Sequence, residues 1–69
     1  MRQRTITDED TLKSLLECGV EVYHRFIGDK AERLRPCNNQ GMLGQWHNPS
    51  WRAGVRRDLR EQSYYVYVE

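Results

Sequence analysis

The chain has 69 residues, of which 38% are hydrophobic and 30% are charged. This length allows one small hydrophobic core and no second one, so we expect a single domain over residues 1–69. The composition is that of a folded globular protein and excludes a disordered tail or a collagen-like repeat. The net charge of +1 argues against strong non-specific binding to DNA.

The sequence contains no sign of a membrane or of secretion. No stretch approaches the roughly 18 uninterrupted apolar residues of a membrane span, and the N-terminus leads into no apolar signal segment. We therefore expect a cytoplasmic protein with no membrane partner. In that compartment Cys18 and Cys37 are predicted to be free thiols rather than a disulfide.

The first predicted element is a helix over residues 6–19. Thr7 can cap its start, the three acidic residues that follow suit the positive end of the helix dipole, and Gly19 can end it in the left-handed conformation. Leucines recur at helical spacing and form one apolar stripe, which we expect to pack on a sheet. These leucines are Leu12, Leu15 and Leu16.

A strand is predicted over residues 20–27, which are rich in β-branched and aromatic side chains. Turn residues at positions 28–30 then allow residues 32–35 to return antiparallel as a hairpin. Pro36 ends this second strand or confines it to an edge. Residues 37–45 contain two asparagines, two glycines and little apolar content, and they predict a surface loop without a phosphate-binding motif.

A short second helix is predicted after Asn48, with Pro49 at its first position and Gly54 as a weak point. Its apolar stripe would be Trp51, Val55 and Leu59. The last predicted element is a strand over residues 63–69, which has to pair with an earlier strand to be ordered, most simply with residues 20–27. The predicted fold is therefore α+β, with an N-terminal helix on a small, mainly antiparallel sheet of about three strands.

Potential metal and catalytic residues are present but lack a recognisable arrangement. The four possible zinc ligands follow one another without the paired spacing of zinc sites, and neither cysteine has the local signature of a nucleophile. We therefore expect no metal, no cofactor and no catalytic residues. The four side chains are Cys18, His24, Cys37 and His47.

Four arginines of the second helix form a candidate nucleic-acid site, because a basic stripe beside aromatic side chains can hold phosphates and stacked bases. The alternative is a solvated helix face with acidic residues interleaved. The arginines are Arg52, Arg56, Arg57 and Arg60.

The aromatic residues form a second candidate surface. Trp46 and Trp51 can recognise a partner or fill the core, and the core is favoured for Trp51 in so small a domain. Tyr65 and Tyr67 are predicted to face outward from the last strand. Because that strand lies at the chain end and can have an open edge, we expect a homodimer or a partner-dependent complex through it, unless residues 20–27 and a second strand enclose it.

Several segments, taken in order, resemble short reading frames of tailed bacteriophages and prophages. They are residues 15–19, residues 20–25, Trp46, residues 48–51 and residues 65–68, that is, a leucine-rich helix end, a Val-Glu-Val-Tyr-His-Arg strand, a tryptophan, an Asn-Pro-Ser-Trp turn and a Tyr-Val-Tyr-Val strand. The chain departs from that pattern by a longer segment at residues 52–62 and by its final residues.

The resemblance implies a phage or prophage origin and carries no established activity. Together with the composition it indicates a small accessory protein, in the cytoplasm of a bacterial host, that binds a host or phage protein without catalysis. Nucleic-acid binding through the four arginines is the alternative.

Overall fold

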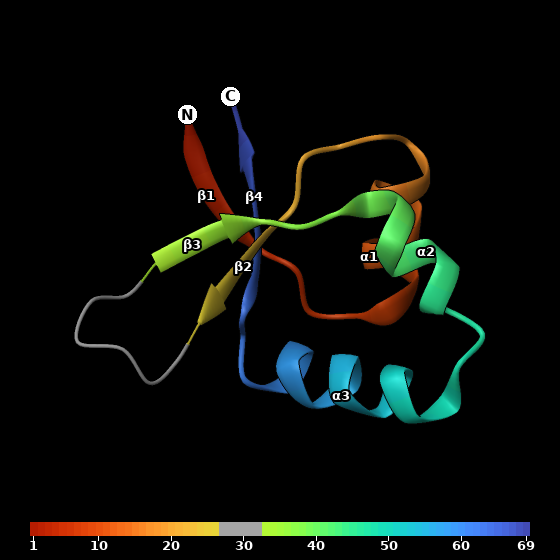
Figure 1. Cartoon of the computed structure of the whole chain (residues 1–69). Coiled ribbons are helices and arrows are strands. Elements are labelled where there is room, and N and C mark those ends of the chain that lie inside the picture. The colour runs from red at the N-terminus through yellow and green to blue at the C-terminus, as the bar shows by residue number, and fades with distance from the viewer. Residues whose placement is uncertain (27–32) are drawn as a thin grey trace.

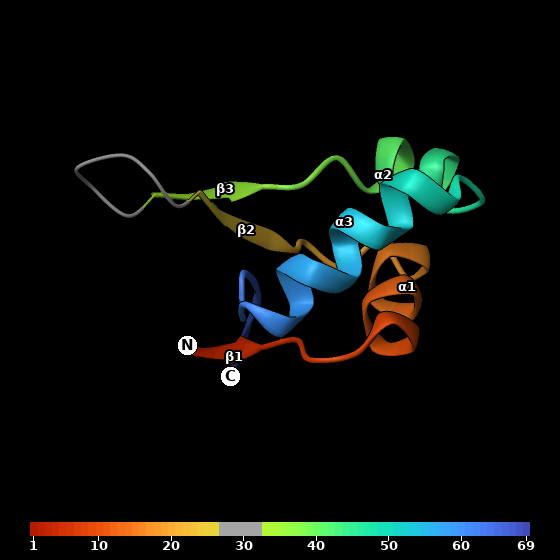
Figure 2. The ribbon, with the colours of Figure 1, turned by 90° about the horizontal axis from the view of Figure 1, so that it is seen from below.

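The computed structural model describes residues 1–26 and 33–69, and within these ranges three helices lie on one side of a four-stranded antiparallel sheet (Figure 1). The view in Figure 2 shows the same separation of helices and strands. The predicted α+β class is confirmed, with one strand and one helix more than expected. The elements are β1 (Arg2–Thr5), α1 (Glu9–Glu17), β2 (Tyr23–Phe26), β3 (Arg33–Pro36), α2 (Asn39–Gln45), α3 (Pro49–Arg60) and β4 (Tyr64–Val68).

The C-terminal strand β4 lies inside the sheet, whose order is β1-β4-β2-β3. Tyr65 has Thr5 of β1 opposite it on one side and Tyr23 of β2 on the other. The predicted pairing of β4 with the segment of residues 20–27 is confirmed. The expectation of an open edge on this strand is wrong, and the alternative, that residues 20–27 and a second strand enclose it, is confirmed by its position between β2 and β1. Among the described strands, β1 and β3 form the edges.

Strand β1 is not predicted by local pattern, because Arg2–Thr5 contains no apolar residue. The strand is ordered by its backbone pairing with β4. Ile6 extends this pairing, because its N–H donates to the carbonyl of Tyr64 at 2.9 Å while its side chain is buried. The chain therefore stays extended through a segment that was predicted to begin a helix.

Helix α1 begins three residues later than predicted. Asp8, and not Thr7, is the cap, because its carboxylate accepts a hydrogen bond from the backbone N–H of Thr11 at 2.9 Å. Gly19 has a φ of 74° and ends the helix in the left-handed conformation, as predicted.

The core lies between the helices and the inner side of the sheet. The leucine stripe of α1 is confirmed, since Leu12 and Leu16 are buried and Leu15 is partly buried. The predicted stripe of α3 also packs there. The buried cluster comprises Ile6, Leu12, Leu16, Val22, Trp46, Val55, Leu59, Tyr64 and Val66.

Residues 37–45, predicted to form a loop, contain helix α2. Asn38 caps it by accepting from the N–H of Gly41 at 3.1 Å, and the Asn39 side chain donates to the carbonyl of Val20 at 2.9 Å. The partly buried Met42 and Leu43 pack against the core. Tertiary packing thus overrides the low helix propensity of the glycines.

Helix α3 follows the prediction, because Asn48 accepts from the N–H of Ser50 at 3.1 Å and Pro49 occupies the first turn. The hairpin of β2 and β3 is also confirmed, and β3 ends at Pro36 on the sheet edge. The turn predicted at positions 28–30 lies outside the described residues. No helix in the described ranges is both long and apolar enough to cross a membrane.

The central position of Leu16 in the core predicts a large loss of stability on truncation. Leu16→Ala should lower the free energy of unfolding by about 2–5 kcal/mol, because the removed atoms leave a cavity that neighbouring side chains fill only partly. Chemical denaturation measures this loss. Leu15→Ala, at a partly buried position of the same helix, should cost less, and equal losses for the two variants would contradict the assigned packing.

Candidate functional site

The candidate site is a groove with a volume of about 370 Å³. It lies between helices α2 and α3 and the part of the β2–β3 hairpin where β2 begins and β3 ends. We call it the Trp51 groove. Its volume lies at the lower end of the range of ligand pockets. Its lining residues are His24, Arg35, Pro36, Cys37, Asn38, Gly41, Met42, Trp51 and Tyr64.

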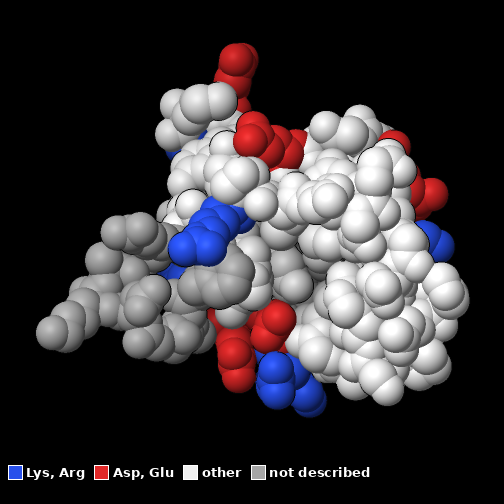
Figure 3. Space-filling model, in the orientation of Figure 1, with Lys and Arg blue, Asp and Glu red and all other residues white. Residues whose placement is uncertain are grey.

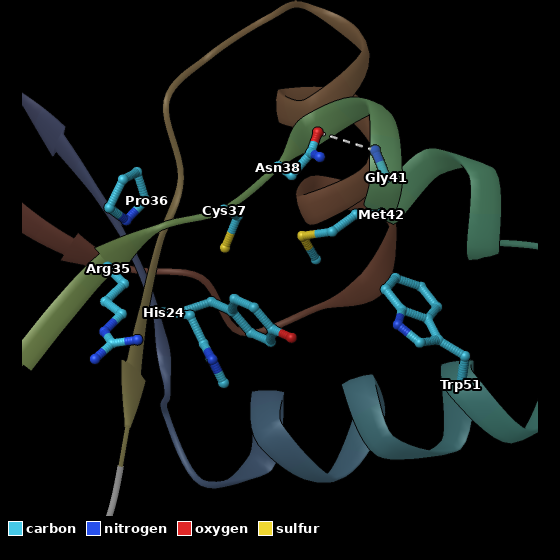
Figure 4. A pocket seen from close by; sticks show the side chains of 9 residues that line it. His24, Arg35, Pro36, Cys37, Asn38, Gly41, Met42 and Trp51 are labelled. Atoms are coloured by element: carbon cyan, nitrogen blue, oxygen red, sulfur yellow. Dashed lines mark hydrogen bonds between the residues drawn. The ribbon is translucent and has the colours of Figure 1, made fainter.

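The two ends of the Trp51 groove differ in chemistry (Figure 4). Trp51, at the start of α3, and Met42, from α2, form an apolar end. His24 of β2 and Arg35 of β3 lie at the opposite end. Asn38 borders the groove, but its side-chain oxygen is occupied by the N–H of Gly41. The groove is therefore apolar at one end and polar at the other.

The surface around the apolar end carries few charges. Residues 36–51 contain no Asp, Glu, Lys or Arg, and Figure 3 shows a wide uncharged area over α2 and the start of α3. Depletion of charge with enrichment of Trp and Met is the compositional mark of an interface core. This uncharged run is therefore a signal in the sequence for the site, and it includes the segment of residues 37–45 that predicts a loop.

At the polar end, the His24 ring stacks on the Tyr64 ring with centroids 4.7 Å apart. The Nε2 atom of His24 lies 3.5 Å from a carboxylate oxygen of Asp58. Burial, and next the negative charge of Asp58, raise the pKa of Tyr64 well above its ordinary value. The phenol therefore stays protonated at neutral pH.

Cys37 lies in the groove as an unreactive thiol. Burial raises its pKa to about 11, so the thiolate that acts as nucleophile or metal ligand is scarce at neutral pH. Cys37 and the exposed Cys18 are both free. Within the described ranges, no three His, Cys, Asp or Glu side chains come together as metal ligands would.

The four arginines of the alternative site face acidic residues. Glu9, in the first turn of α1, accepts a hydrogen bond from Arg52 at 2.9 Å and another from Arg56. Arg60 lines the same hollow, which also contains Asp8 and Asp10. Arg57 is exposed, with its Nε 3.9 Å from a carboxylate oxygen of Asp58. The predicted basic stripe therefore exists, but nearby carboxylates offset much of its charge.

The aromatic partner surface expected from the sequence needs correction. Trp46 is only 9% exposed and belongs to the core cluster, where its ring meets that of Trp51 edge-on with centroids 5.7 Å apart. Tyr65 is 5% exposed because it is in the centre of the sheet and the Arg25 guanidinium lies over its ring, 4.7 Å from the centroid. Neither side chain is available to a partner.

Tyr67 is the exposed member of the expected surface, at 39%. Strand alternation places it with Tyr23, Arg25 and Tyr65 on the side of the sheet opposite the helices, which we call the outer face. Its ring contacts that of Tyr23 edge-on, with centroids 5.3 Å apart. The outer face is a second possible contact surface, smaller than expected.

Comparison with protein-family models, with curated proteins and with solved structures found no match for this chain. The assignment of a function therefore depends on the chemistry of the surfaces described above.

The ion pairs of Glu9 with Arg52 and Arg56, which we call the Glu9 bridge, predict a pH dependence of the free energy of unfolding. Hydrogen bonds from Arg52 and then Arg56 lower the pKa of Glu9 below its ordinary value of 4.5. A lowered folded-state pKa means that the stabilisation is present above the unfolded-state pKa and is lost as the pH falls through the folded-state pKa. Between pH 6 and pH 3 the wild type should lose about 0.5–1 kcal/mol more than Glu9→Gln.

Denaturant titrations at both pH values measure this difference. Glu17→Gln, an exposed position at the other end of the same helix, serves as the matched control and should keep the wild-type dependence. Equal pH dependences for wild type and Glu9→Gln would show that the bridge contributes nothing.

Proposed function

We propose that this chain is a small non-catalytic module that binds a host or phage protein through the Trp51 groove. The observation that carries the proposal is the apolar end of the groove, formed by Met42 and Trp51 within an uncharged surface. Burying such a surface against a partner releases water without the cost of removing charges from it. The partner would insert an apolar side chain between these two residues.

The dimensions of the groove favour a protein partner over a free small molecule. Its volume of about 370 Å³ accommodates one or two side chains, and the uncharged surface continues beyond it over α2 (Figure 3). A contact that extends past the groove lets a protein gain affinity from area that a small ligand cannot reach.

The proposal of a non-catalytic role is supported by the protonated thiol of Cys37, which is the candidate nucleophile of the groove. Cys37 holds a proton at neutral pH because burial raises the pKa of its thiol to about 11, and a thiol is a poor nucleophile. The other groups of the groove suit recognition, since aromatic, thioether and guanidinium groups provide contact and hydrogen bonds.

The phage or prophage origin, and with it a location in the cytoplasm of a bacterial host, is supported by the sequence resemblance alone. The structure offers no open edge on β4 for a homodimer, because β1 and β2 pair with that strand on both sides. The proposal therefore concerns binding to a different protein.

Binding to single-stranded nucleic acid is the second candidate, and it is favoured by the outer face more than by the arginine cluster. Tyr67 is exposed beside Tyr23 there, and bases stack on such rings. The two candidates differ in salt dependence, because phosphate contacts weaken steeply with salt. Fluorescence anisotropy with a labelled oligothymidine at low and moderate salt should show no binding, whereas salt-sensitive binding that Tyr67→Ala abolishes would favour nucleic acid.

Peptide selection tests the protein-binding proposal without knowledge of the partner. A displayed library of random peptides should yield binders on the wild type, and each should bind Met42→Glu at least about tenfold more weakly, because a buried carboxylate lacks a partner. Titration calorimetry measures the affinities. Trp51 lines the groove, so its fluorescence should also change when a peptide binds.

The matched control is Gln40→Glu, which introduces the same charge at an exposed position of the same helix outside the groove. This variant should keep the wild-type affinity within about twofold, as expected for a surface change away from the contact. Failure to select any peptide, or equal weakening by both variants, would contradict the proposal.

A further inference from the structure

Strand β1 is an edge of the sheet, because it pairs with β4 on one side and with none of the described strands on the other. Figure 2 shows it at the opposite end of the sheet from β3. The Ile6 N–H, which donates to the Tyr64 carbonyl at 2.9 Å, sets the phase of its hydrogen bonds. Successive residues of an antiparallel strand direct their backbone groups alternately toward and away from the partner. The even-numbered residues therefore bond to β4, and Gln3 and Thr5 direct their backbone N–H and C=O groups outward.

These four outward groups lack partners within the part of the chain that the structure describes. Gln3 is exposed and Thr5 is half-buried. Figure 1 shows the ends of β1 and β4 extending away from the helices. Unpaired backbone groups on a sheet edge are a template on which another chain can add a strand.

The side chains of β1 decide which strand fits this edge. Arg2 and Arg4 have Val68 and Val66 opposite them, so they point to the inner side of the sheet. Both arginines are exposed, and among the described residues neither forms an ion pair. In a strand added antiparallel, the residue opposite each arginine makes no backbone bond to it, and such pairs bring their side chains close together.

Neither of the nearby acidic residues is bound to these arginines. Asp8 lines a hollow of about 430 Å³ together with Arg4. Its two carboxylate oxygens accept hydrogen bonds from the backbone N–H and the hydroxyl of Thr11, at 2.9 and 2.7 Å. Glu69 lies beyond the end of β4 and is opposite neither arginine. Leu15 borders the same hollow, which leaves room beside Arg4 for a side chain of an added strand.

From this arrangement we infer that β1 is a docking edge for an extended segment of a partner protein, in which acidic residues alternate with uncharged ones. The backbone of the segment bonds to Gln3 and Thr5, and its acidic side chains lie opposite Arg2 and Arg4. A second copy of this chain fits poorly, because the same pairing places arginine opposite arginine, and like charges directly opposite destabilise a sheet. The Trp51 groove takes no part in this contact.

The test uses a peptide capped at both ends, Thr-Val-Glu-Val-Glu-Val-Thr, and isotope-labelled wild-type protein in an NMR titration. The amide signals of Gln3 and Thr5 should shift saturably, with a dissociation constant below about 1 mM. A matched peptide with lysine at both glutamate positions should bind at least about tenfold more weakly, because each lysine then faces an arginine.

Backbone methylation of the peptide tests the strand pairing without any change to the protein. In the proposed register, the N–H groups of the valines face β1 and those of the glutamates face away from it. N-methylation of the central valine should therefore weaken binding by at least about tenfold, because it removes a hydrogen bond and blocks the approach to β1. N-methylation of one glutamate should change the affinity by less than about threefold.

Gln3→Pro removes one outward N–H from β1, and edge strands tolerate proline where the N–H faces solvent. This variant should bind the glutamate peptide about tenfold more weakly, with a melting temperature within about 5 °C of the wild type. The matched control is Gln3→Ala, which removes the side chain and keeps the N–H. It should retain the wild-type affinity within about twofold.

Equal affinities for the glutamate and lysine peptides, or equal losses from the two methylated peptides, would overturn the assignment of β1. So would the absence of a saturable shift at Gln3 and Thr5 up to about 1 mM peptide. A dimer in light scattering that Gln3→Pro dissociates would give the edge to a second copy, which also contradicts it. Shifts confined to Met42 and Trp51 would overturn it and leave the proposed function standing, since that function is tested by Met42→Glu.

Discussion

The insertion of β4 between β1 and β2 is the constraint on which the rest of the fold depends. β1 has no apolar side chain of its own, and its register is set by backbone pairing with β4 alone. Among the described strands, β4 is the one that connects β2 with β1 in the sheet. Tyr64 and Val66 then supply the sheet's contribution to the core. The last residues of the chain therefore hold together segments that are adjacent in space and distant in sequence.

The Trp51 groove is a product of the same arrangement. In the described part of the chain, Tyr23 and His24 are the residues of β2 that have register partners in β4. After β3, the Cys37 N–H donates a hydrogen bond to the Val22 carbonyl at 2.8 Å, which keeps the chain close to the start of β2. Helix α2 packs against α1, so a space remains between the sheet and the start of α3. Tyr64 borders that space because it begins β4, which gives one side chain a place in both the core and the groove.

The sequence predicts the elements whose own residues carry a cap or a clear hydrophobic periodicity. The Asn48–Pro49 start of α3, the leucine stripe of α1 and the Tyr-Val alternation of β4 each contain their own evidence. β1 and α2 were missed because their order comes from distant partners: β4 for Arg2–Thr5, and Val20 and the core for α2. The groove was missed for the same reason, since no single segment contains both Trp51 and His24. Only the uncharged run at residues 36–51 pointed to it.

The arginine cluster of α3 has contacts with α1 that the sequence of α3 alone does not predict. Arg52 and Arg56 form a basic stripe in the sequence, but Glu9 lies more than 40 positions earlier and accepts from both. A phosphate that bound these arginines would have to displace Glu9, leaving a carboxylate that is 24% exposed without its partners and weakening the contact between α1 and α3. The same two side chains cannot join the helices and bind nucleic acid without cost. Their geometry is therefore that of an internal bridge between α1 and α3.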